Sequence, residues 1–247
     1  MGKSLRLGRI FGIPVEINAT WVIIFVLLTF LLVNRFDASS LRWPVPQQWA
    51  VAVVTVLLFF LSVLAHELSH SIVALSRGIR VLGITLFLFG GVSHLEREPE
   101  RPSEEFLISV VGPMTSIGLA VLASGALFWL SPGSWPWAAR DSSPAEMVAF
   151  LLSWGNLSVG IFNMVPGFPL DGGRVLRAIV WAGSGSLVRA TQVAARCGQG
   201  VGLLMIGGGI AYGLKFGWID GVWMAFVGVF LLLVATRSYP GKHGHNG

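Results

Sequence analysis

Six runs of apolar residues divide the chain, and each is long enough to cross a bilayer as a helix. A crossing takes about 20 apolar residues, so six crossings use roughly half of this chain. The pattern predicts an all-α integral membrane protein in which residues 1–247 form a single transmembrane domain, a bundle of about six helices. The predicted spans cover about residues 17–33, 48–75, 106–130, 147–165, 197–214 and 218–236.

Two further segments are predicted to form β-structure. The stretch of about 79–95 is too short and too rich in glycine and β-branched residues for a spanning helix. It predicts a hairpin that turns at Gly90-Gly91 and dips into the membrane, and the opening stretch of about 5–17 adds a strand. We expect a small membrane-associated hairpin or sheet near the cytoplasmic side. The acidic residues between Glu96 and Glu105 predict a solvated loop.

The composition agrees with a membrane protein whose partner is the lipid bilayer. Hydrophobic residues make up 54% of the chain and charged residues 12%, against about 25% charged in soluble proteins. This excludes a soluble enzyme. The basic residues are scattered singly between apolar runs, so nucleic acid is not an expected partner. The single Cys197 excludes an internal disulfide and any multi-cysteine metal site.

The distribution of Lys and Arg predicts the orientation. In the six-span arrangement thirteen of the 17 basic residues lie on one side, and the other side holds only Arg35, Arg42, Arg140 and Lys215. By the positive-inside rule the richer side, with both termini, faces the cytoplasm. The expected location is the cell membrane (an inner or plasma membrane), in a multi-pass arrangement.

Away from the ends of the predicted spans, charged residues and histidines occur only in the second run, at His66, Glu67 and His70; Asp220 lies at the very start of the sixth run. Two histidines four positions apart share a helix face, so both imidazoles can bind one metal ion, and the glutamate beside them can reach a water on that metal. Neutral imidazole is a good ligand for zinc, and catalytic zinc normally takes three protein ligands and one water. A hydrogen-bonded polar cluster between helices is the alternative interpretation.

A third ligand must come from elsewhere, and Asp171 is the best candidate. It follows the fourth run and two prolines three positions apart, Pro166 and Pro169, which end the helix and hold the chain extended. Irregular backbone at membrane depth is tolerated only where protein or water surrounds it, which suits a metal site. The competing interpretation makes Asp171 the N-cap of a helix over about residues 172–182.

These motifs resemble the site-2 protease family of intramembrane zinc metalloproteases, and the resemblance covers nearly the whole chain. It rests on His66-Glu67-Leu68-Ser69-His70, on Asn163-x-x-Pro166-x-x-Pro169-Leu170-Asp171-Gly172, and on Gly8 to Val15, Gly90-Gly91-Val92 and Gly112-Pro113. The most similar branch is archaeal and bacterial, with a six-span core. Several of its members carry cystathionine-synthase-type repeats after the last span. This sequence reaches Gly247 without them, so both a minimal member and a truncated core are open.

The resemblance implies a zinc metalloendopeptidase that acts in regulated intramembrane proteolysis. His66, His70 and Asp171 would bind one Zn²⁺ per chain, Glu67 would be the catalytic base, and Asn163 would contact the substrate backbone or the oxyanion. Its substrates would be single-span membrane proteins such as anti-sigma factors or membrane-tethered transcription factors.

The predicted hairpin suits this chemistry, because a cleavable bond must be extended and an edge strand can pair with it. We therefore expect Gly91, Val92 and Ser93 to bind substrate, with a surface hairpin as the alternative. A different class of function also stays open: a divalent-metal transporter, or an inactive membrane-binding protein, that uses the same ligands.

Overall fold

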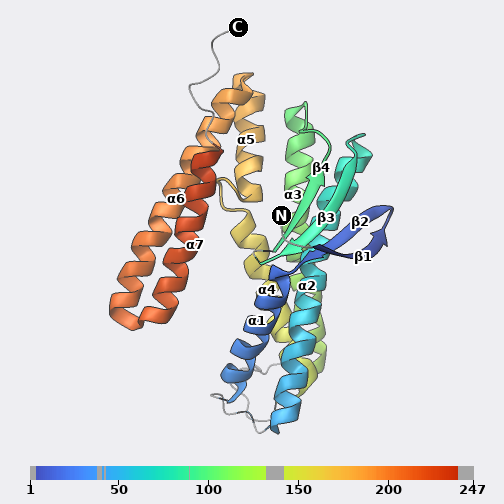
Figure 1. The fold of residues 1–247 in the computed structure, drawn as a ribbon, viewed down its shortest axis with the longest axis vertical. Coiled ribbons are helices and arrows are strands. Elements are labelled where there is room, and N and C mark those ends of the chain that lie inside the picture. Colours follow the sequence, from blue (N-terminus) through green and yellow to red (C-terminus); the bar gives the residue numbers. More distant parts are fainter. Residues whose placement is uncertain (1–3, 38–40, 42, 89, 132–141, 239–247) are drawn as a thin grey trace. The chain divides into compact units, whose positions relative to one another are not determined.

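Helices dominate the computed structural model, which describes residues 4–37, 41, 43–88, 90–131 and 142–238. The described elements are, in order, β1 (Ser4–Ile10), β2 (Ile13–Asn18), α1 (Thr20–Asp37), α2 (Val45–Ser76), β3 (Val81–Phe87), β4 (Gly90–Leu95), α3 (Pro102–Leu130), α4 (Pro144–Asn163), α5 (Asp171–Ser184), α6 (Leu187–Phe216) and α7 (Trp218–Arg237) (Figure 1).

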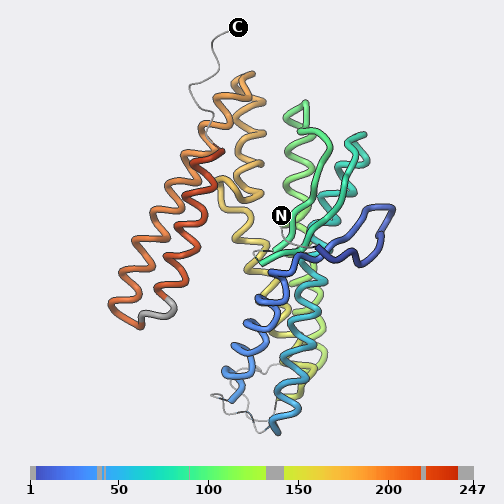
Figure 2. The backbone as a smooth tube through the Cα atoms, in the orientation of Figure 1, coloured from blue at the N-terminus to red at the C-terminus, as the bar shows by residue number. Residues whose placement is uncertain are grey.

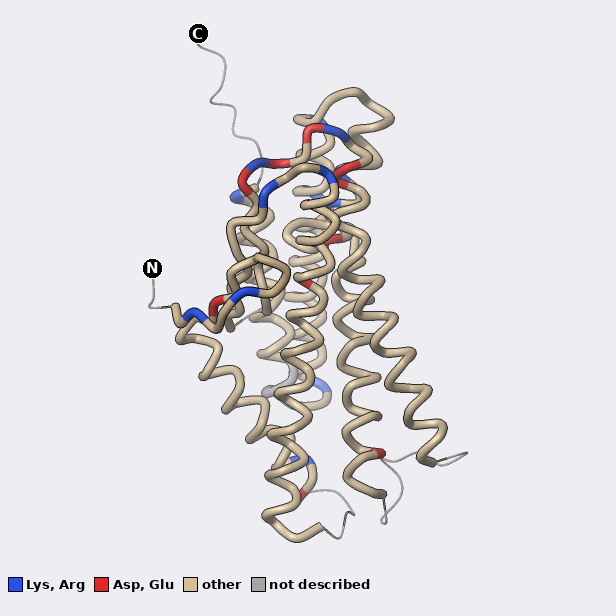
Figure 3. Tube along the Cα trace, turned by 90° about the vertical axis from the view of Figure 1, so that its right-hand side faces the viewer, with Lys and Arg blue, Asp and Glu red and all other residues tan. Residues whose placement is uncertain are grey.

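Five of the described helices are long and apolar enough to cross a membrane: α1, α2, α3, α4 and α6. Where the sequence predicted a sixth span, the structure has a shorter apolar helix, Gly221–Arg237, within α7. Uncharged residues form nearly the whole length of these helices (Figure 3). The predicted fold class, a helical membrane protein with a small sheet, is confirmed.

The chain divides into two compact units. The first contains Met1–Glu98 and Val111–Ile161, and the second contains Pro99–Val110 and Phe162–Gly247. The first unit therefore holds all four strands with α1, α2 and most of α3 and α4. The second holds the start of α3, the end of α4 and the helices α5, α6 and α7.

In the first unit the strands form one sheet in the order β1-β2-β3-β4. The central pair, β2 and β3, is parallel, and the two outer pairs are antiparallel. One face of the sheet is apolar because alternate residues of a strand point to the same side. On it Val15, Ile84 and Leu86 pack against Leu64 of α2. This core places the sheet beside the predicted metal-binding motif, which begins two residues further along α2.

The hairpin differs from the prediction at its glycines. Gly90 and Gly91 lie within β4, paired with Phe87 and Leu86, so the predicted turn at these two residues is wrong. Gly90 has a φ of +128°, which a side chain would strain. Gly91 lies against α2, where a Cβ would collide with the side chain of Glu67. Gly91 is thus explained by close packing on α2, and Gly90 by its backbone conformation, rather than by a turn at the two residues.

At the other end of α2, apolar side chains join it to two neighbouring helices of the first unit. Phe36 of α1, Val51 of α2 and Met147 and Phe150 of α4 form one buried cluster. The buried Asn156 of α4 also donates a hydrogen bond to Ser62 Oγ at 3.2 Å.

In the second unit, α6 and α7 form an antiparallel helical hairpin (Figure 2). Glycines allow the two backbones to approach closely, as small residues do in membrane helices. A Cβ on Gly202 would lie 2.9 Å from the carbonyl oxygen of Gly228, and one on Gly209 would lie 2.6 Å from that of Gly221. The small residues of the fifth apolar run therefore serve helix packing.

Candidate metal centre

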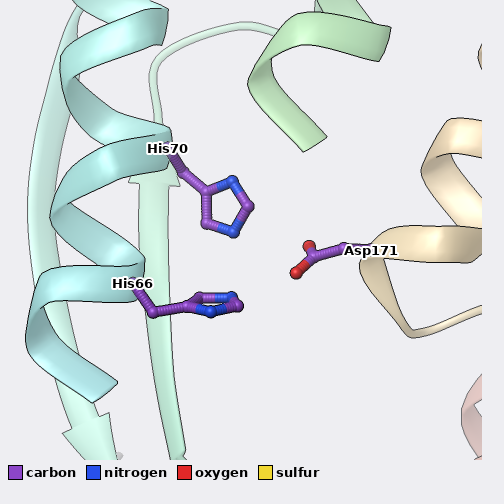
Figure 4. Close-up of side chains that lie close together, drawn as sticks. All are labelled: His66, His70 and Asp171. Carbon is purple, nitrogen blue, oxygen red and sulfur yellow. The ribbon is translucent and has the colours of Figure 1, made fainter. Parts of the chain in front are cut away.

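Two buried histidines lie one helical turn apart on α2. His66 is 4% exposed and His70 is 6% exposed, and both imidazoles extend from the same side of the helix (Figure 4). Their ring centroids are 4.9 Å apart and their planes meet at 75°. Each ring offers a nitrogen within 4.8 Å of one on the other, which is close enough for one ion to bind both.

Helix α3 supports this pair of imidazoles. The Nδ1 atom of His66 lies 2.9 Å from Ser116 Oγ. A ligating histidine normally has its second ring nitrogen held in this way, so His66 is set to bind a metal through Nε2. Gly112 lies one turn before Ser116, and a Cβ there would collide with the Nε2 atoms of His70 and His66. Neither Ser116 nor the packing role of Gly112 was predicted from the sequence.

Glu67 follows the first histidine and extends toward β4. Its Oε2 atom accepts a hydrogen bond from Ser93 Oγ at 2.9 Å. The side chain is half-buried, whereas both histidines are buried. Ser93 was predicted to bind substrate, and the structure places its hydroxyl on this carboxylate. Val92, the residue before Ser93 on the strand, is 40% exposed.

Asp171 is the first residue of α5 (Figure 4). The N-cap position belongs to Leu170, which makes no side-chain capping bond, so the interpretation of Asp171 as an N-cap is wrong by one residue. A carboxylate in the first turn still interacts favourably with the helix dipole. Asn163 is the last residue of α4, seven residues before Leu170.

The loop before α5 is held in place by contacts within the second unit. The backbone N–H of Phe168 donates to the carbonyl of Ala194 on α6 at 3.2 Å. Side chains on Gly172 or Gly173 would collide with the backbone of residues 164–168. The two glycines after Asp171 therefore allow the loop to fold tightly onto the start of the helix.

A buried ion pair joins α5 to the start of α3. Glu105 is fully buried, and its Oε1 atom accepts a hydrogen bond from Arg177 Nε at 2.6 Å. The Arg177 guanidinium also lies 5.3 Å from the centre of the Phe168 ring. The prediction of a solvated acidic loop is therefore wrong for Glu105, because this residue already belongs to α3 and pairs with an arginine.

These side chains have the chemistry of a zinc site. His66 and His70 each offer an imidazole nitrogen, and Asp171 offers a carboxylate oxygen. Two imidazoles and a carboxylate are a common ligand set of catalytic zinc. The glutamate next to the first histidine matches the base of HExxH metallopeptidases. Fold and motif thus define a class: a multi-pass membrane protein with a metallopeptidase motif on a membrane-length helix.

Comparison with known proteins identifies the family. The profile of peptidase family M50 matches residues 54–140 and 134–207. The chain is 39% identical to sll0528 of Synechocystis sp. over 96% of its own length and 60% of that protein. It is 33% identical to zinc metalloprotease MJ0392 of Methanocaldococcus jannaschii, over 83% of the chain and 54% of that protein. The chain belongs to peptidase family M50.

The fold agrees with a solved structure. The site-2 protease from Methanocaldococcus jannaschii superposes with a TM-score of 0.62 and 26% sequence identity, over 99% of both chains. The resemblance drawn from the sequence motifs is therefore confirmed. The chain spans 60% of the length of sll0528 and 54% of the length of MJ0392.

Proposed function

We propose that this protein is an integral-membrane zinc endopeptidase that hydrolyses peptide bonds of single-span membrane proteins. The observation that carries the proposal is the pair of buried imidazoles on a membrane-length helix, with the carboxylate of Glu67 between them in sequence and half-buried beside β4. Membership of a peptidase family favours hydrolysis over the alternatives of metal transport and passive membrane binding.

His66, His70 and Asp171 would hold one zinc ion per chain. The donor set fits zinc, and the contact of His66 Nδ1 with Ser116 sets the other ring nitrogen for the metal. When bound, zinc lowers the pKa of its water and polarises the scissile carbonyl. The strand β4 contacts α2 through Ser93, which lies against Glu67 and Ser71.

Glu67 would act as the general base and then as the general acid. Its carboxylate takes a proton from the attacking water and afterwards gives that proton to the leaving amine. Ser93 binds Oε2, so the other carboxylate oxygen, Oε1, is the one that would receive the proton. The two tasks need a carboxylate that is held but not enclosed, and the half-buried Glu67 meets that need.

The substrate would be a transmembrane helix that unwinds at the cleavage site. A carbonyl within a helix is bonded to an amide four residues on, and a free strand edge supplies new partners as the helix opens. Strand β4 is an outer strand of the sheet and packs on α2 beside Glu67. Its residues Gly91 to Ser93 would pair with the substrate backbone. Asn163, at the end of α4, would contact that backbone or the oxyanion.

Anti-sigma factors and membrane-tethered transcription factors are the substrates that the family resemblance suggests. The excess of Lys and Arg on one side supports a topology with both termini, and cleavage, on the cytoplasmic face.

The test is cleavage by the purified full chain in detergent. A single-span substrate peptide is incubated with the protein as purified, after removal of metal by a chelator, and after zinc is added back. Products are identified by mass spectrometry, and bound zinc is measured by elemental analysis. We expect cleavage that is lost with zinc and restored by it. Zinc flux into proteoliposomes without any cleavage would instead support the transporter.

A further inference from the structure

The carboxylate of Glu67 is held by a small hydroxyl network between α2 and β4. Ser93 Oγ lies 2.9 Å from Glu67 Oε2 and 3.1 Å from the main-chain oxygen of the same residue. Ser71, fully buried one turn further along α2, places its Oγ 3.0 Å from that main-chain oxygen and 3.2 Å from Ser93 Oγ. Two serines, from a helix and a strand, thus converge on one glutamate.

The number of hydroxyl protons limits which of these contacts can be hydrogen bonds at the same time. Each serine has a single O–H to donate. The carboxylate oxygen is the nearer acceptor of Ser93 and the charged one, and bonds to charged acceptors are the stronger kind. Ser71 can then donate to the main-chain oxygen of Glu67 or to Ser93 Oγ. Every donor in the network has an acceptor when Ser93 donates to Oε2.

Gly91 shapes the same contact from the same face of β4. It lies two residues before Ser93, and residues two apart in a strand point to one side. An ideal Cβ on Gly91 would lie 2.5 Å from Glu67 Cγ. The absence of a side chain at Gly91 lets the Glu67 stem approach the strand closely enough for Ser93 to reach its carboxylate.

We propose that Ser93 is a positioning residue for Glu67. Its hydroxyl fixes Oε2 and thereby turns Oε1 toward the attacking water, while Ser71 orients the Ser93 hydroxyl. This role rests on the proposed function, in which Glu67 is the base. It assigns the Ser93 side chain to the base, and it is separate from the main-chain pairing with substrate that is proposed for Gly91 to Ser93. Strand β4 would then hold the base and the substrate together.

The two roles of Ser93 predict different kinetics. A side chain that acts through Glu67 changes the chemical step, so its loss lowers kcat and leaves KM nearly unchanged. A side chain that binds substrate changes KM and the affinity for uncleaved substrate. From the typical strength of a hydrogen bond to a charged group, Ser93→Ala should lower kcat by about tenfold to a hundredfold.

The experiment compares Ser93→Ala with Ser93→Thr, which keeps the hydroxyl, and with Ser76→Ala as a matched control. Ser76 is also a serine of this region, and its hydroxyl donates to the main-chain oxygen of Val73 at 2.7 Å. For each purified full-length variant, kcat and KM on a single-span substrate, bound zinc and thermal unfolding are measured. Binding of the intact substrate is measured separately in Glu67→Gln protein with and without Ser93→Ala.

We expect Ser93→Ala to lose kcat with KM within about twofold, Ser93→Thr to recover most of it, and Ser76→Ala to match the parent protein. Zinc content should be unchanged, and Ser93→Ala should not weaken substrate binding in the Glu67→Gln background. A rise in KM with weaker binding would assign Ser93 to the substrate and overturn the proposal. Loss of zinc or of folding in Ser93→Ala, or equal loss in Ser93→Thr, would overturn it too. Full turnover by Glu67→Gln would reject the proposed base itself.

Discussion

Gly112→Ala adds one methyl group to the face of α3 that lies against both histidines. An ideal Cβ at this position would be 2.7 Å from His66 Nε2 and would also collide with His70 Nε2, whereas real Cβ atoms essentially never approach within 3.0 Å. Both imidazoles are buried, so they have little room to withdraw. The added methyl must therefore displace the two proposed zinc ligands or push α3 away from α2.

The size of the effect follows from the tolerance of zinc sites. Metal–ligand distances in such sites stay within about 0.2 Å of their preferred values, and the clash requires a shift of several tenths of an ångström to restore an ordinary contact. Changes just outside the ligands typically cost about 10- to 100-fold in metal affinity. We expect at least a loss of that size for Gly112→Ala, with a parallel loss of proteolysis.

A measurement of thermal stability alone would not distinguish displacement of the zinc ligands from a change in the stability of helix α3. Replacing glycine by alanine favours a helix by about 1 kcal/mol, but a Cβ before Pro113 disfavours helical backbone. The decisive measurement is the zinc dissociation constant of purified protein, obtained by competition with a chromophoric chelator. Gly118→Ala and Gly125→Ala are matched controls on the same helix, since a Cβ at either position meets nothing within 4 Å. Wild-type zinc affinity in Gly112→Ala would refute this account of the site.

Two further predictions address the third ligand and the edge strand. Asp171→Ala should lower zinc affinity together with activity, whereas the control Glu146→Ala, which removes a first-turn carboxylate from α4, should leave zinc binding unchanged. Zinc binding by both variants is measured by elemental analysis and chelator titration. Full zinc occupancy with normal turnover in Asp171→Ala would limit the role of Asp171 to helix stability. Val92→Pro should reduce cleavage of an intact membrane helix far more than cleavage of a short extended peptide, because proline removes a backbone N–H donor from the strand without touching the Ser93 contact to Glu67. Val92→Ala is the control variant. Equal loss of cleavage on both substrates would reject the pairing of substrate with the strand.

The sequence reveals most about those parts of the site that are close together in the chain. His66 and His70 share a helix face because they are four positions apart, and α2 places both of them on one side as expected. The long apolar runs likewise predict the membrane-length helices, and the fold class follows from them. Local periodicity is enough for both inferences.

Local periodicity could not predict which side chains from distant segments of the chain would be in contact. Ser116 is fifty residues from His66, and Ser93 is 26 residues from Glu67. Which serine meets which side chain depends on the register of β4 and on the rotation of α3, and neither is encoded in a short pattern. The glycine doublet shows the same difficulty: it was interpreted as a turn, but Gly91 is required by the Glu67 side chain on a neighbouring helix.

Buried charge was also hard to predict. Glu105 ends an acidic stretch that is typical of a solvated loop, yet it is fully buried against Arg177. The pairing arginine lies 72 residues away, so the local pattern contained no signal for it.

The central claim is that Glu67 performs the chemistry while the histidines hold the metal. The most direct measurement is turnover together with bound zinc for Glu67→Gln, with Glu96→Gln as the matched control, since Glu96 pairs with Arg80 at the surface. We expect Glu67→Gln to keep zinc near one ion per chain and to lose at least about a hundredfold in kcat, while Glu96→Gln keeps both. Zinc retention with undiminished cleavage by Glu67→Gln would contradict the account.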